Sequence, residues 1–323
     1  MLLKRCVIAG CVSLAMVSSA FAAQTLRMGY DHTNEHPTGQ ALIKFGELVE
    51  KYTNGQYKVK LYPNGQLGDE RKMLEQVQNN VLDMTKTATV LMATYAPEYS
   101  VLVMPYMFKG PDHFDKVMNG DIGKGMKMLT AKKGLVGLSF LYDEPRSYYT
   151  TKKQIVTPED LKGVKMRVMN SADAINVAKT MGATPTPLPW GEVYTSLQQG
   201  VVDGAEGGPS ALTLYKHGDV AKFFSNTQHV LYPGEIVIGT RTWNKLSDAN
   251  KAAFVRAAEE AARIQMSEFI KLQTQAMSDM QKMGVTITSP DLKAFHARAA
   301  EYYKQFASDP KLQSLIERIQ SVK

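Results

Sequence analysis

Hydrophobic positions switch between two periods along the first part of the chain. Apolar residues alternate over 26–30, which is typical of a strand with one buried face, and recur at helical spacing over 41–52 behind Pro37. The period then returns to two over 57–62 and to the helical value over 73–81. These patterns predict a strand, a helix, a strand and a helix in that order.

The same order of elements returns after Pro145. The expected elements are a short helix over 157–161, a strand over 164–168, a helix over 171–181, an extended segment over 184–189, a helix over 191–199 and a strand over 201–206. Repeated β-α-β units predict an α/β fold with open, mixed or mainly parallel sheets covered by helices. Ligands of such sheets bind near the carboxyl ends of the strands, so two blocks imply a cleft between two lobes.

The region between Ser247 and Met283 contains neither proline nor glycine, and its apolar residues keep helical spacing. About 36 residues at ~1.5 Å each would span on the order of 50 Å, which is longer than one lobe requires. Two interpretations fit this pattern. The segment forms two helices that meet in a bend, or one helix that runs across both lobes and bends when the cleft closes.

The N-terminus has the pattern of a secretory signal peptide. Lys4 and Arg5 precede an apolar run that ends at the small-x-small pattern Ala20-Phe21-Ala22, so residues 1–22 are expected to be cleaved and the protein to be periplasmic. Lipid attachment at Cys11 is the less favoured alternative. Because the two cysteines, Cys6 and Cys11, both lie in this segment, disulfides, thiolate metal sites and cysteine nucleophiles are excluded from the remainder.

Composition narrows the classes of function further. The chain has 38 basic and 31 acidic residues, and removal of Lys4 and Arg5 lowers the formal charge from +7 to +5. This surplus favours small anions modestly. The basic residues are interspersed with acidic ones and not clustered with aromatics, so nucleic-acid binding is not expected.

Three segments carry a more specific pattern: 155–168 (IVTPEDLKGVKMRV), 182–185 (GATP) and 192–206 (EVYTSLQQGVVDGAE). They closely resemble the substrate-binding subunits of tripartite ATP-independent periplasmic (TRAP) transporters, the DctP family. The order of elements from Leu26 to the long helix agrees as well. The resemblance therefore covers essentially the whole chain after the predicted signal peptide.

The resemblance implies two α/β lobes joined by crossing strands and a long helix, which close around an organic acid. We expect residues 23–143 plus about 233–272 to form the first lobe, and 144–232 plus about 273–323 the second. It also implies no cofactor and a membrane partner with a small and a large integral subunit, driven by an ion gradient. The sequence contains no phosphate-binding loop of the G-x-x-x-x-G-K-S/T type, in agreement with that energy source.

Two arginines are the expected carboxylate ligands. Arginine donates two parallel, charge-assisted hydrogen bonds to a carboxylate. Arg167 lies near the end of the 164–168 strand, and the resemblance assigns it the salt bridge to the ligand carboxylate. Arg146 matches a second family arginine. Together they could hold both ends of a diacid, or one carboxylate and a hydroxyl.

Four other residues are candidate ligand contacts. Glu206 could accept hydrogen bonds from sugar hydroxyls, and many family members have an asparagine directly after it where this chain has Gly207 and Gly208. Glu70 and His32 follow strands of the first lobe, at positions that face a cleft between lobes. Trp190 could offer its indole N–H or its ring face to a sugar.

Enzyme alternatives lack a matching group of residues. His32 and His36 do not form the His-Glu-x-x-His pattern of zinc hydrolases, and no G-x-S-x-G turn occurs. We therefore expect a binding protein without a metal, whose ligand is a sugar acid such as a uronate or an aldonate. A C4-dicarboxylate or keto-acid binding protein, and a sensory binding protein of the same fold, remain alternatives.

Overall fold

A computed structural model describes residues 23–323 of the chain. The predicted signal peptide and the alternative at Cys11 lie outside the described residues. Within the described part, no helix combines the length and the apolar character needed to cross a membrane.

The first lobe is built on a five-stranded sheet in the order β2-β1-β3-β10-β4. Its strands are β1 (Gln24–Gly29), β2 (Tyr57–Tyr62), β3 (Met84–Ala88), β4 (Leu135–Leu141) and β10 (Gly234–Gly239). β1 pairs in parallel with β2 and β3, whereas β10 is antiparallel to β3 and β4. The sheet is therefore mixed, because the chain returns from the second lobe to insert β10.

Helices cover this sheet as the apolar periodicity predicts. α1 (Pro37–Tyr52) begins with His36, whose side chain accepts a hydrogen bond from the Thr38 amide, and α1 packs on the long helix. α2 (Glu70–Gln78) is capped by Asp69. The predicted helix over 73–81 was too long: α2 ends at Gln78, and Val81 is 57% exposed. Asn80 adopts a left-handed backbone conformation there, which ends the helical hydrogen-bond pattern.

The second lobe has a six-stranded sheet in the order β11-β9-β5-β8-β6-β7. Its strands are β5 (Arg146–Thr150), β6 (Lys165–Val168), β7 (Thr184–Pro187), β8 (Gly204–Gly207), β9 (Phe223–Val230) and β11 (Thr286–Thr288). The parallel strands β8, β6 and β7 bring the ends of β6 and β7 together, so the loops that follow them meet at the cleft.

Shorter helices complete the two lobes. They are α3 (Thr89–Met92), α4 (Tyr99–Leu102), α5 (Pro111–Asn119), α6 (Asp121–Met126), α7 (Ala172–Met181), α8 (Val193–Gln198), α9 (Pro209–Thr213), α10 (Thr240–Lys245), α12 (Lys293–Lys304) and α13 (Pro310–Ser321). The helix predicted over 157–161 is a single 3-10 turn over Pro158–Leu161 with the expected capping box between Thr157 and Asp160.

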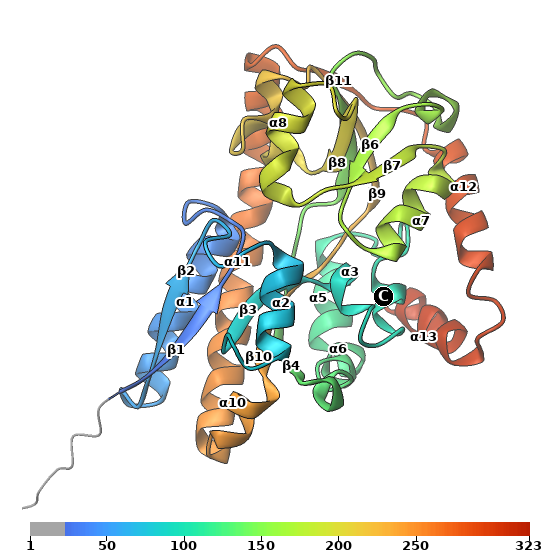
Figure 1. Cartoon of the computed structure of the whole chain (residues 1–323). Helices are drawn as coiled ribbons and strands as arrows, with labels where there is room; N and C mark the ends of the chain where they lie inside the picture. Colours follow the sequence, from blue (N-terminus) through green and yellow to red (C-terminus); the bar gives the residue numbers. More distant parts are fainter. Residues whose placement is uncertain (1–22) are drawn as a thin grey trace, which may run out of the picture.

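The lobes are joined by two chain crossings and one helix (Figure 1). Residues 142–145 connect β4 to β5, and residues 231–233 connect β9 to β10. α11 (Asp248–Lys282) is a single 35-residue helix, so the interpretation as two helices is excluded. It packs on α1 and β4 of the first lobe and on α9 and β11 of the second. The two-lobed α/β fold with a spanning helix is thereby confirmed.

The C-terminal segment also contacts both lobes. α12 packs on α7 of the second lobe, whereas α13 lies on α4 of the first. His113 and Lys109, at and just before α5, contact the carbonyl oxygens of Ile319 and Gln320 at 3.0 and 2.7 Å. The sequence grouped this whole segment with the second lobe, and the lobe boundaries stay a prediction.

Candidate functional site

A cavity of about 390 Å³ lies between the lobes. The chain reaches it through the loops that follow β1, β3, β6, β7 and β8, as expected for a site at the carboxyl ends of strands. Its lining includes residues of the first lobe (Asp31, His32, Glu70, Lys86) and of the second (Arg146, Arg167, Trp190, Tyr215). The wall is strongly charged on both sides.

Arg167 is the most deeply buried cation of the second-lobe wall. It lies on β6, is 2% exposed, and donates from Nε and Nη2 to the carbonyl oxygen of Leu188 at 2.9 and 2.7 Å. Its guanidinium also lies 5.6 Å from the ring centre of Trp190. Within residues 23–323, Nη1 of Arg167 has no hydrogen-bond partner. Burial, and then the charge of Arg146, lower the pKa of Arg167 to about 10.

Arg146 is fixed by a buried carboxylate. Its Nε donates to Oε1 of Glu206 at 3.3 Å, its Nη2 donates to the Glu206 carbonyl at 2.6 Å, and its guanidinium lies over the ring of Tyr232. Oε2 of Glu206 is 3.2 Å from Nε2 of His229. Burial alone would raise the pKa of Glu206, but Arg146 and His229 hold this pKa below its usual value. Glu206 thus remains a carboxylate that orients Arg146.

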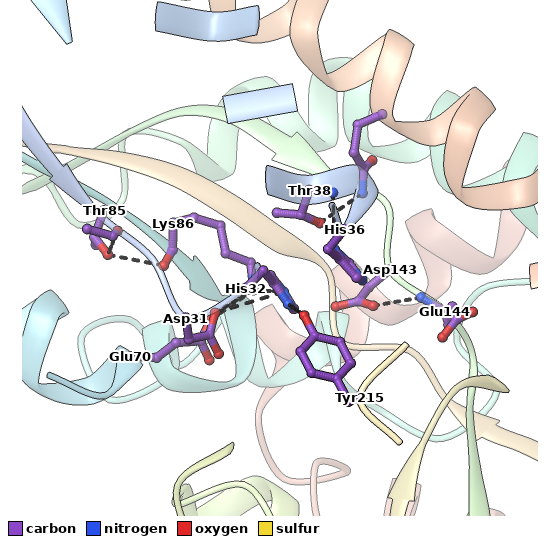
Figure 2. A network of polar contacts seen from close by, with 12 residues as sticks. Asp31, His32, His36, Thr38, Glu70, Thr85, Lys86, Asp143, Glu144 and Tyr215 are labelled. Atoms are coloured by element: carbon purple, nitrogen blue, oxygen red, sulfur yellow. Dashed lines mark hydrogen bonds and ion pairs between the residues drawn. The ribbon is translucent and has the colours of Figure 1, made fainter. Parts of the chain in front are cut away.

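The first-lobe wall is a cluster around Lys86 (Figure 2). Nζ of Lys86 donates to Oε1 of Glu70 at 2.9 Å and lies 3.1 Å from Nε2 of His32. Oδ1 of Asp31 is 3.9 Å from this ammonium and, within the described residues, has no hydrogen-bond partner. Burial and the neighbouring Asp31 raise the pKa of Glu70 to about 7. Asp143, on the crossing between β4 and β5, also lines the cavity, and burial raises the pKa of its carboxyl group.

A hydrogen bond between side chains joins the two walls at His32 and Tyr215. Nδ1 of His32, which follows β1, lies 2.7 Å from the hydroxyl of Tyr215, which follows α9. The His32 ring is stacked on His36 with centroids 4.2 Å apart, and Trp190 meets Tyr215 edge to face at 5.0 Å. Burial and Lys86 hold the pKa of His32 well below its usual range, so this imidazole is neutral.

The loop after Glu206 needs its second glycine for a steric reason. A Cβ at Gly208 would overlap the side chain of Glu144. That carboxylate accepts hydrogen bonds from the Ser210 amide at 3.1 Å and from its hydroxyl at 2.6 Å, which holds the start of α9. Gly207 and Gly208 both line the cavity at the position where many family members carry asparagine.

The structure brings five of the six predicted site residues to the cavity. Arg167, Arg146, Glu70, His32 and Trp190 line it, whereas Glu206 lies behind Arg146. Their contacts with a ligand stay predictions. In residues 23–323, no group of three or more His, Cys, Asp or Glu residues is placed to hold a metal ion.

Two important residues were missed by the analysis of the sequence. Lys86 carried a usable signal, because a lysine in the middle of the buried strand β3 needs a carboxylate partner. Tyr215 carried none, since it lies in a loop 183 positions from the histidine that it contacts.

Comparisons with known proteins agree with this architecture. Residues 28–309 match the model of the bacterial extracellular solute-binding protein family 7. A solute-binding protein of Chromohalobacter salexigens is 34% identical over 331 residues, which cover 98% of this chain and 98% of that protein.

Solved structures extend the likeness to the fold. A TRAP periplasmic solute-binding protein from Chromohalobacter salexigens with bound D-glucuronate has a TM-score of 0.88 at 33% identity, covering 92% of this chain and all of that one. One from Polaromonas bound to D-erythronate has a TM-score of 0.89 at 32% identity, covering 93% and 99%. This chain therefore belongs to the bacterial extracellular solute-binding protein family 7, the solute-binding proteins of TRAP transporters.

Proposed function

We propose that this protein captures a sugar acid with a single carboxylate, a uronate or an aldonate, between its lobes and delivers it to the membrane subunits of a TRAP transporter. The observation that carries the proposal is the buried guanidinium of Arg167, whose Nη1 has no hydrogen-bond partner within residues 23–323. A buried donor without a partner costs free energy. A ligand carboxylate at this position would remove that cost and form a charge-assisted pair.

Arg146 supplies the second cation of the same wall. Because Glu206 holds it from behind, its guanidinium is oriented before any ligand arrives. A rigid donor loses little conformational entropy on binding. Arg167 and Arg146 would therefore bind one end of the ligand together.

The opposite wall disfavours a second carboxylate on the ligand. The carboxylates of Asp31, Glu70 and Asp143 all interact with Lys86, the single ammonium at the centre of this cluster. Another negative charge would be repelled by Asp31 and Asp143, whereas hydroxyl groups could donate to them. A ligand with one carboxylate and several hydroxyls matches both walls.

The solved relatives support the same class of compound. D-glucuronate and D-erythronate, bound in two of them, each combine one carboxylate with several hydroxyls. In such a protein, closure around the acid is coupled to binding, and the closed form is what a small and a large membrane subunit would recognise. We infer a periplasmic location, following residues 1–22, and release of the acid without chemical change.

Isothermal titration of the protein with uronates, aldonates, C4-dicarboxylates and keto acids tests the proposal. We expect a uronate or aldonate to bind. At a concentration 100 times its Kd, this ligand should stabilise the folded protein by about 2.7 kcal/mol and raise the Tm by several degrees. Arg167→Ala should weaken binding about 30-fold or more, because a buried charge pair is broken. Arg298→Ala, which removes an exposed arginine of α12, is the matched control and should bind normally.

Three outcomes would contradict the proposal. Tighter binding of a C4-dicarboxylate would show that the first-lobe wall accepts a second charge. Unchanged affinity in Arg167→Ala would show that the carboxylate anchor lies elsewhere. Conversion of the bound acid, followed by NMR of the released compound, would show that the protein is an enzyme.

A further inference from the structure

The contact between His32 and Tyr215 crosses the cleft between the lobes. The two side chains belong to different lobes, and they meet at 2.7 Å on the wall of the cavity (Figure 2). Opening the lobes must break this hydrogen bond. Its direction follows from the groups around His32.

Lys86 determines which nitrogen of His32 carries the hydrogen. A lysine ammonium has only hydrogens to donate, and Nζ of Lys86 lies 3.1 Å from Nε2 of His32. Nε2 of the neutral ring must therefore be the acceptor, and Nδ1 must carry the hydrogen. Glu70 and Asp31 outweigh the effect of burial and raise the pKa of Lys86, so this ammonium stays charged.

The hydroxyl hydrogen of Tyr215 can then be donated to the ligand. Its hydroxyl oxygen accepts from Nδ1–H of His32, and within residues 23–323 no hydrogen bond uses the hydroxyl hydrogen. Tyr215 also packs edge to face on Trp190, which lies over Arg167. The ring is thus held in place on the cavity wall from the second lobe.

We propose that Tyr215 is a ligand-binding latch, which accepts a hydrogen bond from His32 only when the lobes are closed and donates its own hydrogen to an oxygen of the bound sugar acid. The hydrogen bond from Tyr215 to the ligand rests on the proposed function, whereas the contact between the lobes does not. Other hydrogen bonds also link the lobes: Arg71 donates to the Asn170 carbonyl at 2.6 Å, and the Ser100 hydroxyl donates to Asp173 at 2.7 Å.

Closure without ligand is measured first. Spin labels at Glu75→Cys on α2 and Asn176→Cys on α7, two exposed positions in different lobes, report the distance between the lobes in protein that begins at Ala23 and so lacks Cys6 and Cys11. In Tyr215→Phe, we expect pulsed EPR to show a larger share of long distances than in the parent. Tyr194→Phe is the matched control, since Tyr194 is on α8 outside the cavity wall.

Release of D-glucuronate is measured second, by the fluorescence of Trp190 in protein that carries Trp243→Phe. One lost hydrogen bond predicts dissociation faster by about 2- to 12-fold in Tyr215→Phe and unchanged in Tyr194→Phe. His32→Phe should add less in the Tyr215→Phe background than alone, because the pair acts as a unit.

The outcomes separate the two proposals. Distances and release rates in Tyr215→Phe that equal those of the parent would overturn the latch, as would full additivity of the two substitutions. Absence of sugar-acid binding by the parent would overturn the proposed function, while the ligand-free distances would still decide whether His32 and Tyr215 hold the lobes together.

Discussion

At the scale of single residues, the neighbouring side chains decide which buried charged groups reach the cavity. Glu206 is 1% exposed and Arg146 stands between it and the cavity, so its carboxylate acts through the arginine. Glu235 is another buried carboxyl group, in the first lobe. Gly137 leaves room for its carboxyl group, and Tyr99 is its hydrogen-bond partner at 3.1 Å.

We predict that Glu206→Gln weakens sugar-acid binding about 10-fold or more, although the side chain does not line the cavity. The neutral amide loses the charge that orients Arg146, and a bond to a charged group contributes about 1.5 to 3 kcal/mol. Isothermal titration measures the effect, with the exposed Glu159→Gln as control. Normal affinity in Glu206→Gln would mean that the charge of Glu206 is not needed to orient Arg146.

The second prediction at this scale concerns Glu235 and pH. Burial raises its pKa to about 8 in the folded protein, far above the value of 4.5 for an exposed group. The folded state therefore favours the neutral form, and stability falls as the pH rises from about 4.5 to about 8.

Glu235→Gln should remove this loss, because the amide stays neutral. Urea unfolding at pH 5 and pH 9 should show a decrease that is larger in the parent than in the variant, by about 2 kcal/mol or more. The exposed Glu159→Gln should follow the parent at both values. Parallel pH profiles of parent and Glu235→Gln would contradict the buried neutral carboxyl.

At the scale of elements, the turn between β8 and α9 shapes the cavity. Glu144 reaches from the β4–β5 crossing to bind the start of α9, and Gly208 leaves the space for it. The turn thereby connects the β4–β5 crossing to the wall that carries Tyr215.

We predict that Gly208→Ala lowers both stability and affinity. The added methyl group overlaps Glu144, and separating that carboxylate from Ser210 leaves a buried group unpaired at a cost of about 1 to 3 kcal/mol. Calorimetry and titration measure the two effects. Gly191→Ala is the control, because Gly191 also lines the cavity but a Cβ there would meet nothing within 4 Å. Equal behaviour of the two variants would refute the steric argument.

At the scale of the whole molecule, one hydrophobic core extends through both lobes. It includes Met73 and Val237 of the first lobe, Met166 of the second, and Phe295 and Ile319 of the C-terminal helices. α11 adds a second continuous link. Two lobes that share this much buried apolar surface are stabilised together.

We therefore predict a single unfolding transition. The chain has two tryptophans, Trp190 in the second lobe and Trp243 on α10 of the first, so Trp190→Phe and Trp243→Phe each leave a reporter for one lobe. In each variant, the urea midpoint measured by fluorescence should equal the midpoint measured by circular dichroism. Separate midpoints for fluorescence and dichroism would show that the lobes unfold independently.

The sequence by itself determined the order of strands and helices, and it left one spanning helix as one of two interpretations of the segment between Ser247 and Met283. These conclusions follow from side-chain period and from the absence of proline and glycine in that segment. The positions of His32, Glu70 and Trp190 after strands placed them at the expected cleft, whereas Arg167 and Arg146 were assigned to the ligand through the resemblance. The resemblance to TRAP solute-binding proteins and the family assignment rest on the same linear pattern.

Only the tertiary structure decided which side chains meet. Glu206 was a candidate ligand contact, and in the structure its carboxylate binds Arg146 and is not part of the cavity lining. Tyr215 and Lys86 became part of the site because folding brings a loop of one lobe and a buried strand of the other to His32. Distances between residues far apart in the chain depend on packing and strand order, which no local period of the sequence encodes.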